Sequence, residues 1–151
     1  MILDERTEFA DAGDFATEAG TSNVGDVIDL GTSGRSPGGG QPVYLIITIE
    51  TSADGGAATN GTTAFQLVSD SVSTPATNGT QTIHFTSDAY LGASQLTAGD
   101  VLVFPLPSGM TYERYLGMQV VQAVEGEDDL VASAYLSLDP HEWVAYPDAT
   151  N

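Results

Sequence analysis

Residues 43–50 read Val43-Tyr44-Leu45-Ile46-Ile47-Thr48-Ile49-Glu50, and this run is the most informative about the fold. In an extended chain, alternate side chains point to opposite faces, so that Val43, Leu45, Ile47 and Ile49 share one apolar face. More than half of the run is β-branched, and such side chains are enriched in strands. The run therefore predicts a central strand with one face in a hydrophobic core.

Six other segments show the same alternation between turn residues: 27–30, 63–68, 81–86, 101–106, 116–124 and 130–138. Their predicted inward side chains are Phe65, Leu67, Ile83, Phe85, Leu102, Phe104, Leu106, Leu116, Met118, Val120, Val124, Leu130, Ala132, Ala134, Leu136 and Leu138, whereas His84 is expected to point outward. No stretch of useful length has the 3.6-residue period of an amphipathic helix. The sequence thus predicts an all-β fold, an antiparallel jelly-roll-like β-sandwich.

Three parts of the chain differ in composition. Residues 1–25 are polar and acidic with few apolar side chains, which favours an extended N-terminal arm. Residues 26–139 hold the predicted strands and form the sandwich domain. Residues 140–151 are expected to form an irregular C-terminal tail, because Pro140 and Pro147 bracket it.

The charge balance excludes several classes of partner. Three arginines and no lysine stand against 21 Asp and Glu, which gives a formal net charge of -18. Nucleic acid and anionic membranes are therefore not expected as partners, since both are polyanions. The chain has no cysteine, so that it forms no disulfide and no thiolate metal site. An acidic start and the lack of a long apolar run indicate a soluble protein made in a cytosol.

Two motifs could carry chemistry, and the sequence disfavours both. Residues 34–38 match the G-x-S-x-G pattern of a hydrolase with Ser36 as nucleophile, but Pro37 and the glycines after it cannot open the required helix. Residues 125–129 are rich in the oxygen ligands that Ca²⁺ prefers, but their spacing fits no EF-hand, and a solvated acidic loop is favoured. We expect no catalytic residue, no cofactor and no metal.

Large apolar and aromatic side chains near the chain ends and at the start of the 116–124 segment are candidate contact residues, because rigid rings are common in protein interfaces. We also expect Arg114, one of the three cations, to pair with a carboxylate at its turn. The candidate contacts are Ile2, Leu3, Phe9, Phe15, Tyr112, Arg114, Tyr115, Trp143 and Tyr146.

Several strings together resemble the capsid cement proteins of short-tailed double-stranded-DNA bacteriophages, in order from the first residue to the last. The strings are Met1-Ile2-Leu3-Asp4, Val27-Ile28-Asp29-Leu30-Gly31, Phe65-Gln66-Leu67-Val68-Ser69-Asp70, Leu106-Pro107-Ser108-Gly109, Tyr112-Glu113-Arg114-Tyr115-Leu116-Gly117, Tyr135-Leu136-Ser137-Leu138-Asp139-Pro140 and Tyr146-Pro147-Asp148. The resemblance implies a non-enzymatic jelly-roll protein, made in the bacterial host cytoplasm, that decorates the outer surface of an icosahedral head.

The same resemblance implies a homodimer that clamps neighbouring subunits of the major capsid protein, so that the candidate contacts would touch the shell or the second copy. Another function remains open at this point. A β-sandwich of a virion could instead bind carbohydrate or a receptor, with Ca²⁺ in the 125–129 loop and Trp143 as a stacking platform.

Overall fold

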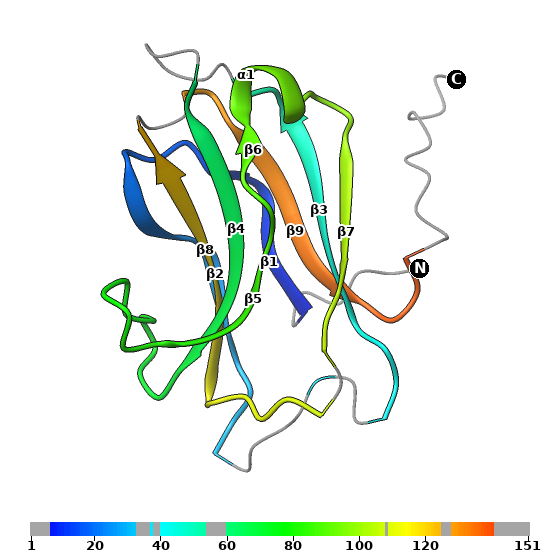
Figure 1. Cartoon of the computed structure of the whole chain (residues 1–151). Coiled ribbons are helices and arrows are strands. Elements are labelled where there is room, and N and C mark those ends of the chain that lie inside the picture. The colour runs from blue at the N-terminus through cyan, green and yellow to red at the C-terminus, as the bar shows by residue number, and fades with distance from the viewer. Residues whose placement is uncertain are drawn as a thin grey trace.

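Two antiparallel sheets face each other across an apolar layer (Figure 1). The computed structural model describes residues 7–32, 37, 40–53, 60–107, 109–124 and 128–140. One sheet has the order β1 (Glu8–Asp14), β9 (Val131–Ser137), β3 (Tyr44–Thr51), β7 (Val101–Pro105). The other has the order β2 (Gly20–Asp29), β8 (Tyr115–Ala123), β4 (Thr62–Asp70), β5 (Thr82–Thr86), and β6 (Tyr90–Leu91) also pairs with β4. A single turn of helix, α1 (Gly92–Gln95), follows β6.

The strand order is that of a jelly roll. Without the two-residue β6, the described strands form two four-stranded sheets, and every pairing within them is antiparallel. The chain passes from one sheet to the other between β1 and β2, between β2 and β3, and between β3 and β4. Such crossing connections wrap a double-sheet jelly roll. The predicted antiparallel β-sandwich is therefore confirmed.

The apolar layer is built as the alternation predicts. Leu45, Ile47 and Ile49 of β3 are completely buried, with 0% exposure, and belong to one core cluster with Phe65 and Leu67 of β4. The predicted inward residues of β8 and β9 join the same cluster, namely Leu116, Met118, Val120, Ala132, Ala134 and Leu136, as does Leu130 just before β9. Burial of this size is the main source of stability for such a fold.

Two predicted core residues lie beyond the strand ends instead. Val124 is 64% exposed, because β8 ends at Ala123 and the positive φ of Val124, 77°, breaks the alternation. Leu138 is 58% exposed, because β9 ends at Ser137. Both assignments to the core are wrong, because each residue lies one position beyond the end of its hydrogen-bonded strand.

A bulge in β5 reverses the predicted faces of two side chains. Leu67 pairs with Phe85, but the next residue, Val68, pairs with Ile83, so that His84 is the extra residue. An extra residue switches the alternation on one side of a bulge. His84 is consequently buried, with 7% exposure, and Ile83 is 46% exposed. The prediction of an inward Ile83 and an outward His84 is wrong, whereas Phe85 does pack against the core.

The predicted N-terminal arm is wrong for most of its length. Strand β1 and the first part of β2 lie within residues 1–25, and each pairs with a strand of the opposite half of the chain. Phe9 and Phe15 are buried, with exposures of 1% and 0%. These polar strands form because β9 and β8 supply the partner backbone groups and because two phenylalanine rings complete the core.

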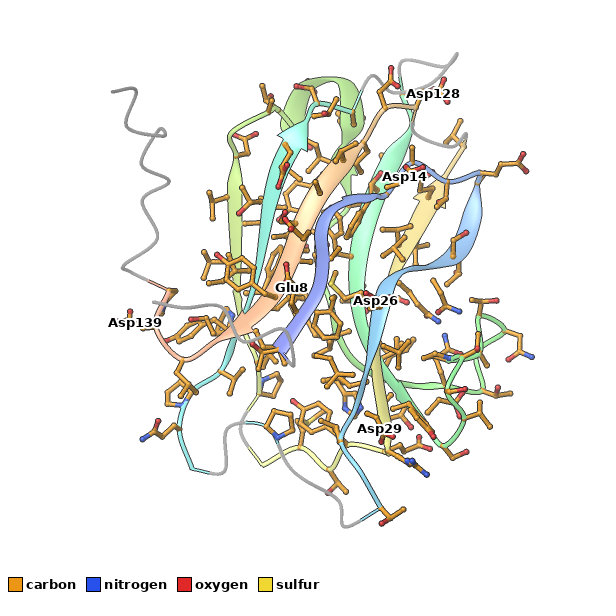
Figure 2. The ribbon with its side chains drawn as sticks, turned by 180° about the vertical axis from the view of Figure 1, so that it is seen from behind. Glu8, Asp14, Asp26, Asp29, Asp128 and Asp139 are labelled. Atoms are coloured by element: carbon orange, nitrogen blue, oxygen red, sulfur yellow. The ribbon has the colours of Figure 1, made fainter. Side chains whose placement is uncertain are left out.

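One side of the sandwich is closed by direct backbone contact between β1 and β2, which face the viewer in Figure 2. Gly25 has a φ of +67°, and a Cβ added to it would meet the carbonyl oxygen of Phe9 at 2.3 Å. Only glycine fits both the left-handed backbone and this approach. Gly25 therefore sets how closely the two edge strands pack.

We expect Gly25→Ala to lower the free energy of unfolding by about 3 kcal/mol, combining about 1–2 kcal/mol for a left-handed residue with the cost of the clash. Gly31→Ala is the matched control, because Gly31 has a φ of +80° and nothing within 4 Å of an added Cβ. Gly31→Ala should lose only the part of the free energy of unfolding that comes from the left-handed backbone. Urea denaturation measures both, and equal losses would contradict the close contact.

Candidate functional site

The end of the sandwich where β2 stops and β8 starts carries an ordered surface cluster. Asp29 is the last residue of β2 and pairs with Tyr115, the first residue of β8. Arg114 precedes β8 and binds Asp29 with two parallel hydrogen bonds, Nε to Oδ1 at 2.9 Å and Nη2 to Oδ2 at 2.8 Å. The Leu30 N–H donates to the Arg114 carbonyl oxygen at 2.8 Å. The predicted pairing of Arg114 with a carboxylate is confirmed.

Electrostatics and ring packing order this cluster further. The bonds from Arg114, together with the Gly31 N–H, lower the pKa of Asp29 from 3.8 to about 2. The Arg114 guanidinium also lies 4.8 Å from the centre of the Tyr115 ring, a cation–π distance. The side chains of Arg114 and Asp29 are 42% and 45% exposed. In the cluster of Asp29, Arg114 and Tyr115, the exposed guanidinium is thus held in place by a carboxylate and an aromatic ring.

A second set of polar side chains lies near this cluster, inside the sandwich. His84 Nε2 shares a 2.7 Å hydrogen bond with Ser69 Oγ, and the Glu113 N–H donates to the same Ser69 oxygen at 3.0 Å. The Tyr112 ring, with a centroid 4.5 Å from that of His84, covers the imidazole. Ser69 is completely buried, so that no substrate can reach its hydroxyl. This serine–histidine pair therefore ties the segment before β8 to β4 and β5.

Burial also controls the charge of His84. It lowers the pKa of His84 below 6.5, while the negative field of Glu113 opposes the shift. Its Nδ1 atom is buried without a hydrogen-bond partner. Protonation would place a charge on this unpartnered edge, which is costly in a dry site. The neutral imidazole is therefore the stable form.

An amide network, which the sequence analysis missed, pins the β4–β5 connection onto the outer face of its own sheet. Gln119 of β8 is completely buried and donates to the Ala76 carbonyl and to Asn23 Oδ1, both at 2.8 Å. Gln81 donates to Gln119 at 3.1 Å. A Cβ on Gly117 would lie 3.1 Å from Pro75 Cγ, so this glycine admits the loop. The sequence signal that could have indicated this network is Gln119, which stands in an apolar strand two residues after Gly117.

The predicted contact residues separate into four groups. Phe9 and Phe15 are core residues, so that the surface role predicted for them is wrong. Tyr112 is buried against His84, with 8% exposure, and offers little surface. Arg114 and Tyr115 lie together in the surface cluster. The predictions for Ile2, Leu3, Trp143 and Tyr146 lie outside the described residues.

Carboxylates spread over both ends and the β1–β2 side of the molecule, as the labelled side chains of Figure 2 show. The β1–β2 side is hollowed by an open cleft of about 450 Å³ that Glu8, Asp11 and Asp26 line together with Phe9 and Ala10. Among the described residues, no three His, Asp or Glu side chains are placed to hold a metal ion. Residues 125–127 of the candidate calcium loop, and Ser36, lie outside the described ranges.

Removal of the guanidinium should raise the pKa of Asp29. In Arg114→Gln we expect it to move from about 2 toward 3.8, but only partway, because the Gly31 N–H still donates to this carboxylate. Carboxyl-carbon NMR titration measures the shift. Asp70 is the internal control, since backbone N–H groups, chiefly that of Ala76, lower its pKa. A shift of Asp70 equal to that of Asp29 would indicate a general change of structure.

Burial of neutral His84 should make stability depend on pH. Because the pKa of His84 is lowered in the folded state, the unfolded chain binds the proton more readily. The contribution of neutral His84 to the free energy of unfolding is therefore complete above pH 6.5 and declines as the pH falls through and below this value. We expect His84→Gln to remove the loss of unfolding free energy between about pH 7.5 and about pH 5. His141→Gln, the control for the other histidine, should keep it. Urea denaturation at each pH measures the slope, and a slope that persists in His84→Gln contradicts this assignment.

Comparison with known proteins places the chain in a family. No curated protein matches it. In the part of the chain that the structure describes, no helix is long and apolar enough to cross a membrane. Residues 10–126 match the protein family described as Bbp16, and this range runs from within β1 to just beyond β8 and contains the Arg114 cluster. Because the match covers most of its length, the chain belongs to the Bbp16 family, a phage-related family.

Proposed function

We propose that this protein is a capsid cement protein of a phage, a structural and non-enzymatic component of the outer surface of the head. One observation carries the proposal: the match to the phage-related family runs from within β1 through β8 and so includes strands of both sheets of the jelly roll. The partners proposed are the major capsid protein, whose neighbouring subunits the protein clamps, and a second copy of the chain.

Rigidity supports a clamping role. A clamp transmits force between the subunits that it joins, so its surface must keep its shape under load. Two of the described connections are tied down by long-range hydrogen bonds, one from Gln119 to Ala76 and one from Glu113 to Ser69. Buried polar groups satisfied in this way fix one conformation of a fold. The polar interior thus contributes a stiff body with defined ends.

The charge supports a position outside the shell. A body with a formal charge of -18 is repelled by packaged DNA and by other bodies of the same sign. On the outer surface, the same charge keeps particles apart in solution. An acidic outer coat therefore fits a decoration role better than a position at the genome.

The Arg114 cluster is the described surface that we propose for the shell contact. Its guanidinium is held in place by Asp29 and by the Tyr115 ring, so that little side-chain entropy is lost on binding. Arginine and tyrosine are both enriched in the residues that dominate binding energy. Because the chain has only three cations, an acidic group of the shell would find few side chains to pair with other than this guanidinium.

Sedimentation with phage heads tests the proposal. The purified protein is mixed with expanded heads that lack it, pelleted and quantified, and the heads are then heated until they rupture. We expect saturable binding and a higher rupture temperature. If the folded protein does not pellet with heads and instead binds a glycan in the presence of calcium, it is a receptor-binding module and the cement function is wrong.

Two matched variants test the shell contact. Arg114→Gln removes the guanidinium, and Asp29→Asn keeps it but removes its ion-pair partner. If Arg114 touches the shell, Arg114→Gln should weaken binding by about tenfold or more, as expected for a hot-spot arginine, and Asp29→Asn should weaken it far less. Equal losses would mean that the pair acts only through the shape of this end.

A further inference from the structure

The outer edge of β7 carries backbone groups that no described strand pairs. Among the described residues, β7 is the last strand of its sheet and pairs only with β3. The Leu106 N–H donates to the Val43 carbonyl, and the Asp100 carbonyl accepts from Ile49, so that even-numbered residues face β3. The alternation of an antiparallel ladder then directs the N–H and C=O groups of Val101 and Val103 outward. These four groups are spaced to accept another strand.

The other three sheet edges are blunted. Register shifts interrupt the pairing of β1 with β9, of β2 with β8, and of β5 with β4, whereas the ladder between β7 and β3 has none. Strands β1 and β2 also carry Glu8, Asp11 and Asp26 beside the cleft. Bulges and charges are the usual protection of an edge against further pairing. Of the four described sheet edges, only that of β7 has neither a register shift nor a charged side chain.

The side of the sandwich at β7 is also open. Phe104 of β7 meets Phe85 of β5 across the two sheets, with ring centroids 4.9 Å apart, and both rings are only partly buried against the core. Leu102 is likewise only partly buried. The opposite side, at Gly25 and Phe9, is closed by backbone contact. A strand added beside β7 would cover the remaining exposed part of Leu102 and Phe104.

The lack of charge on this edge indicates which partner can pair with it. Residues 101–107 contain no charged side chain, and Val101 and Val103 are 48% and 40% exposed. Two copies that each carry a charge of -18 repel one another unless the surfaces that meet lack carboxylates. The uncharged β7 edge meets that condition, and its backbone groups complement those of a second, antiparallel β7.

We propose that two copies of this chain pair edge to edge through β7, with Val101 opposite the partner's Val103 and the reverse. In this register all four outward groups of each copy find partners in the other copy, and Pro105, which has no N–H, stays outside the ladder. The two Asp100 side chains lie about 13 Å apart along the ladder, farther than the screening length at physiological salt. The inference rests on the pairing that forms part of the proposed function, and it assigns the surface for it.

One test compares two aspartates at equally exposed, branched positions of edge strands. Val103→Asp places carboxylates within the proposed ladder, and Ile83→Asp, at 46% exposure, places one on the bulged β5 edge. Sedimentation velocity over a range of concentrations measures the dimer. We expect Val103→Asp to weaken dimerisation by more than about tenfold, because like charges meet in the interface, and Ile83→Asp to leave it unchanged. Cooperative urea unfolding verifies that each variant is folded.

A cross-linking test holds even if Val103→Asp does not fold. The chain has no cysteine, so that V101C and V103C each introduce a single thiol. Directly paired residues have Cα atoms about 5.5 Å apart, within disulfide range, whereas diagonal neighbours are at about 7–8 Å. Under mild oxidation we expect a covalent dimer when the two variants are mixed, and little from either variant alone.

Four results would overturn the inference: a wild-type protein that is monomeric at every concentration, a folded Val103→Asp variant that dimerises like the wild type, an equal effect of Ile83→Asp, or no cross-link in the mixture. Head binding is measured separately. A monomer that still stabilises heads would end this inference but not the cement function. A β7-linked dimer that ignores heads would do the reverse.

Discussion

Burial of two apolar sheet faces against each other is the constraint on which the rest of this structure depends. The chain has no cysteine to form a disulfide, and a net charge of -18 opposes any compact state through self-repulsion. The side chains of β3, β4, β8 and β9 that meet in the core are almost all completely buried. The free energy of removing them from water therefore has to exceed both the chain entropy and the electrostatic repulsion.

Polar side chains fix the positions of the connections, which the apolar layer does not determine. Burial is not directional, so that it does not by itself hold a loop in one place. Gln119 and the pair of Ser69 and His84 provide that direction, because each unmade hydrogen bond in the interior would be costly. Both groups lie in the sheet that contains β2, β8, β4 and β5, and both hold connections at or near the end that carries Arg114. Buried hydrogen bonds therefore hold the connections at this end in place.

The two sides of the sandwich are finished differently, and the difference has a functional meaning. Gly25 lets β1 and β2 touch, which closes one side and leaves carboxylates around it. At the other side, Phe85 of β5 meets Phe104 of β7, and residues 101–107 carry no charge. The proposed decoration role requires one surface where acidic copies can meet, and a second where a shell can bind. The proposed assignments use separate surfaces for the two roles.

The fold class and most of the core could be predicted from the sequence, because the period-two pattern of runs such as Val43–Glu50 follows directly from the geometry of a strand. It also indicated the pairing of Arg114 with a carboxylate, since a rare cation among many acids has ready partners. Only the tertiary structure decided the roles of Phe9, Phe15 and His84. Strand β1 carries no clear alternation and exists because β9 pairs with it, and a bulge that depends on β4 turns His84 inward. Local pattern reports what a segment prefers, whereas edge strands, bulges and buried amides are decided by the partners that the fold brings to them.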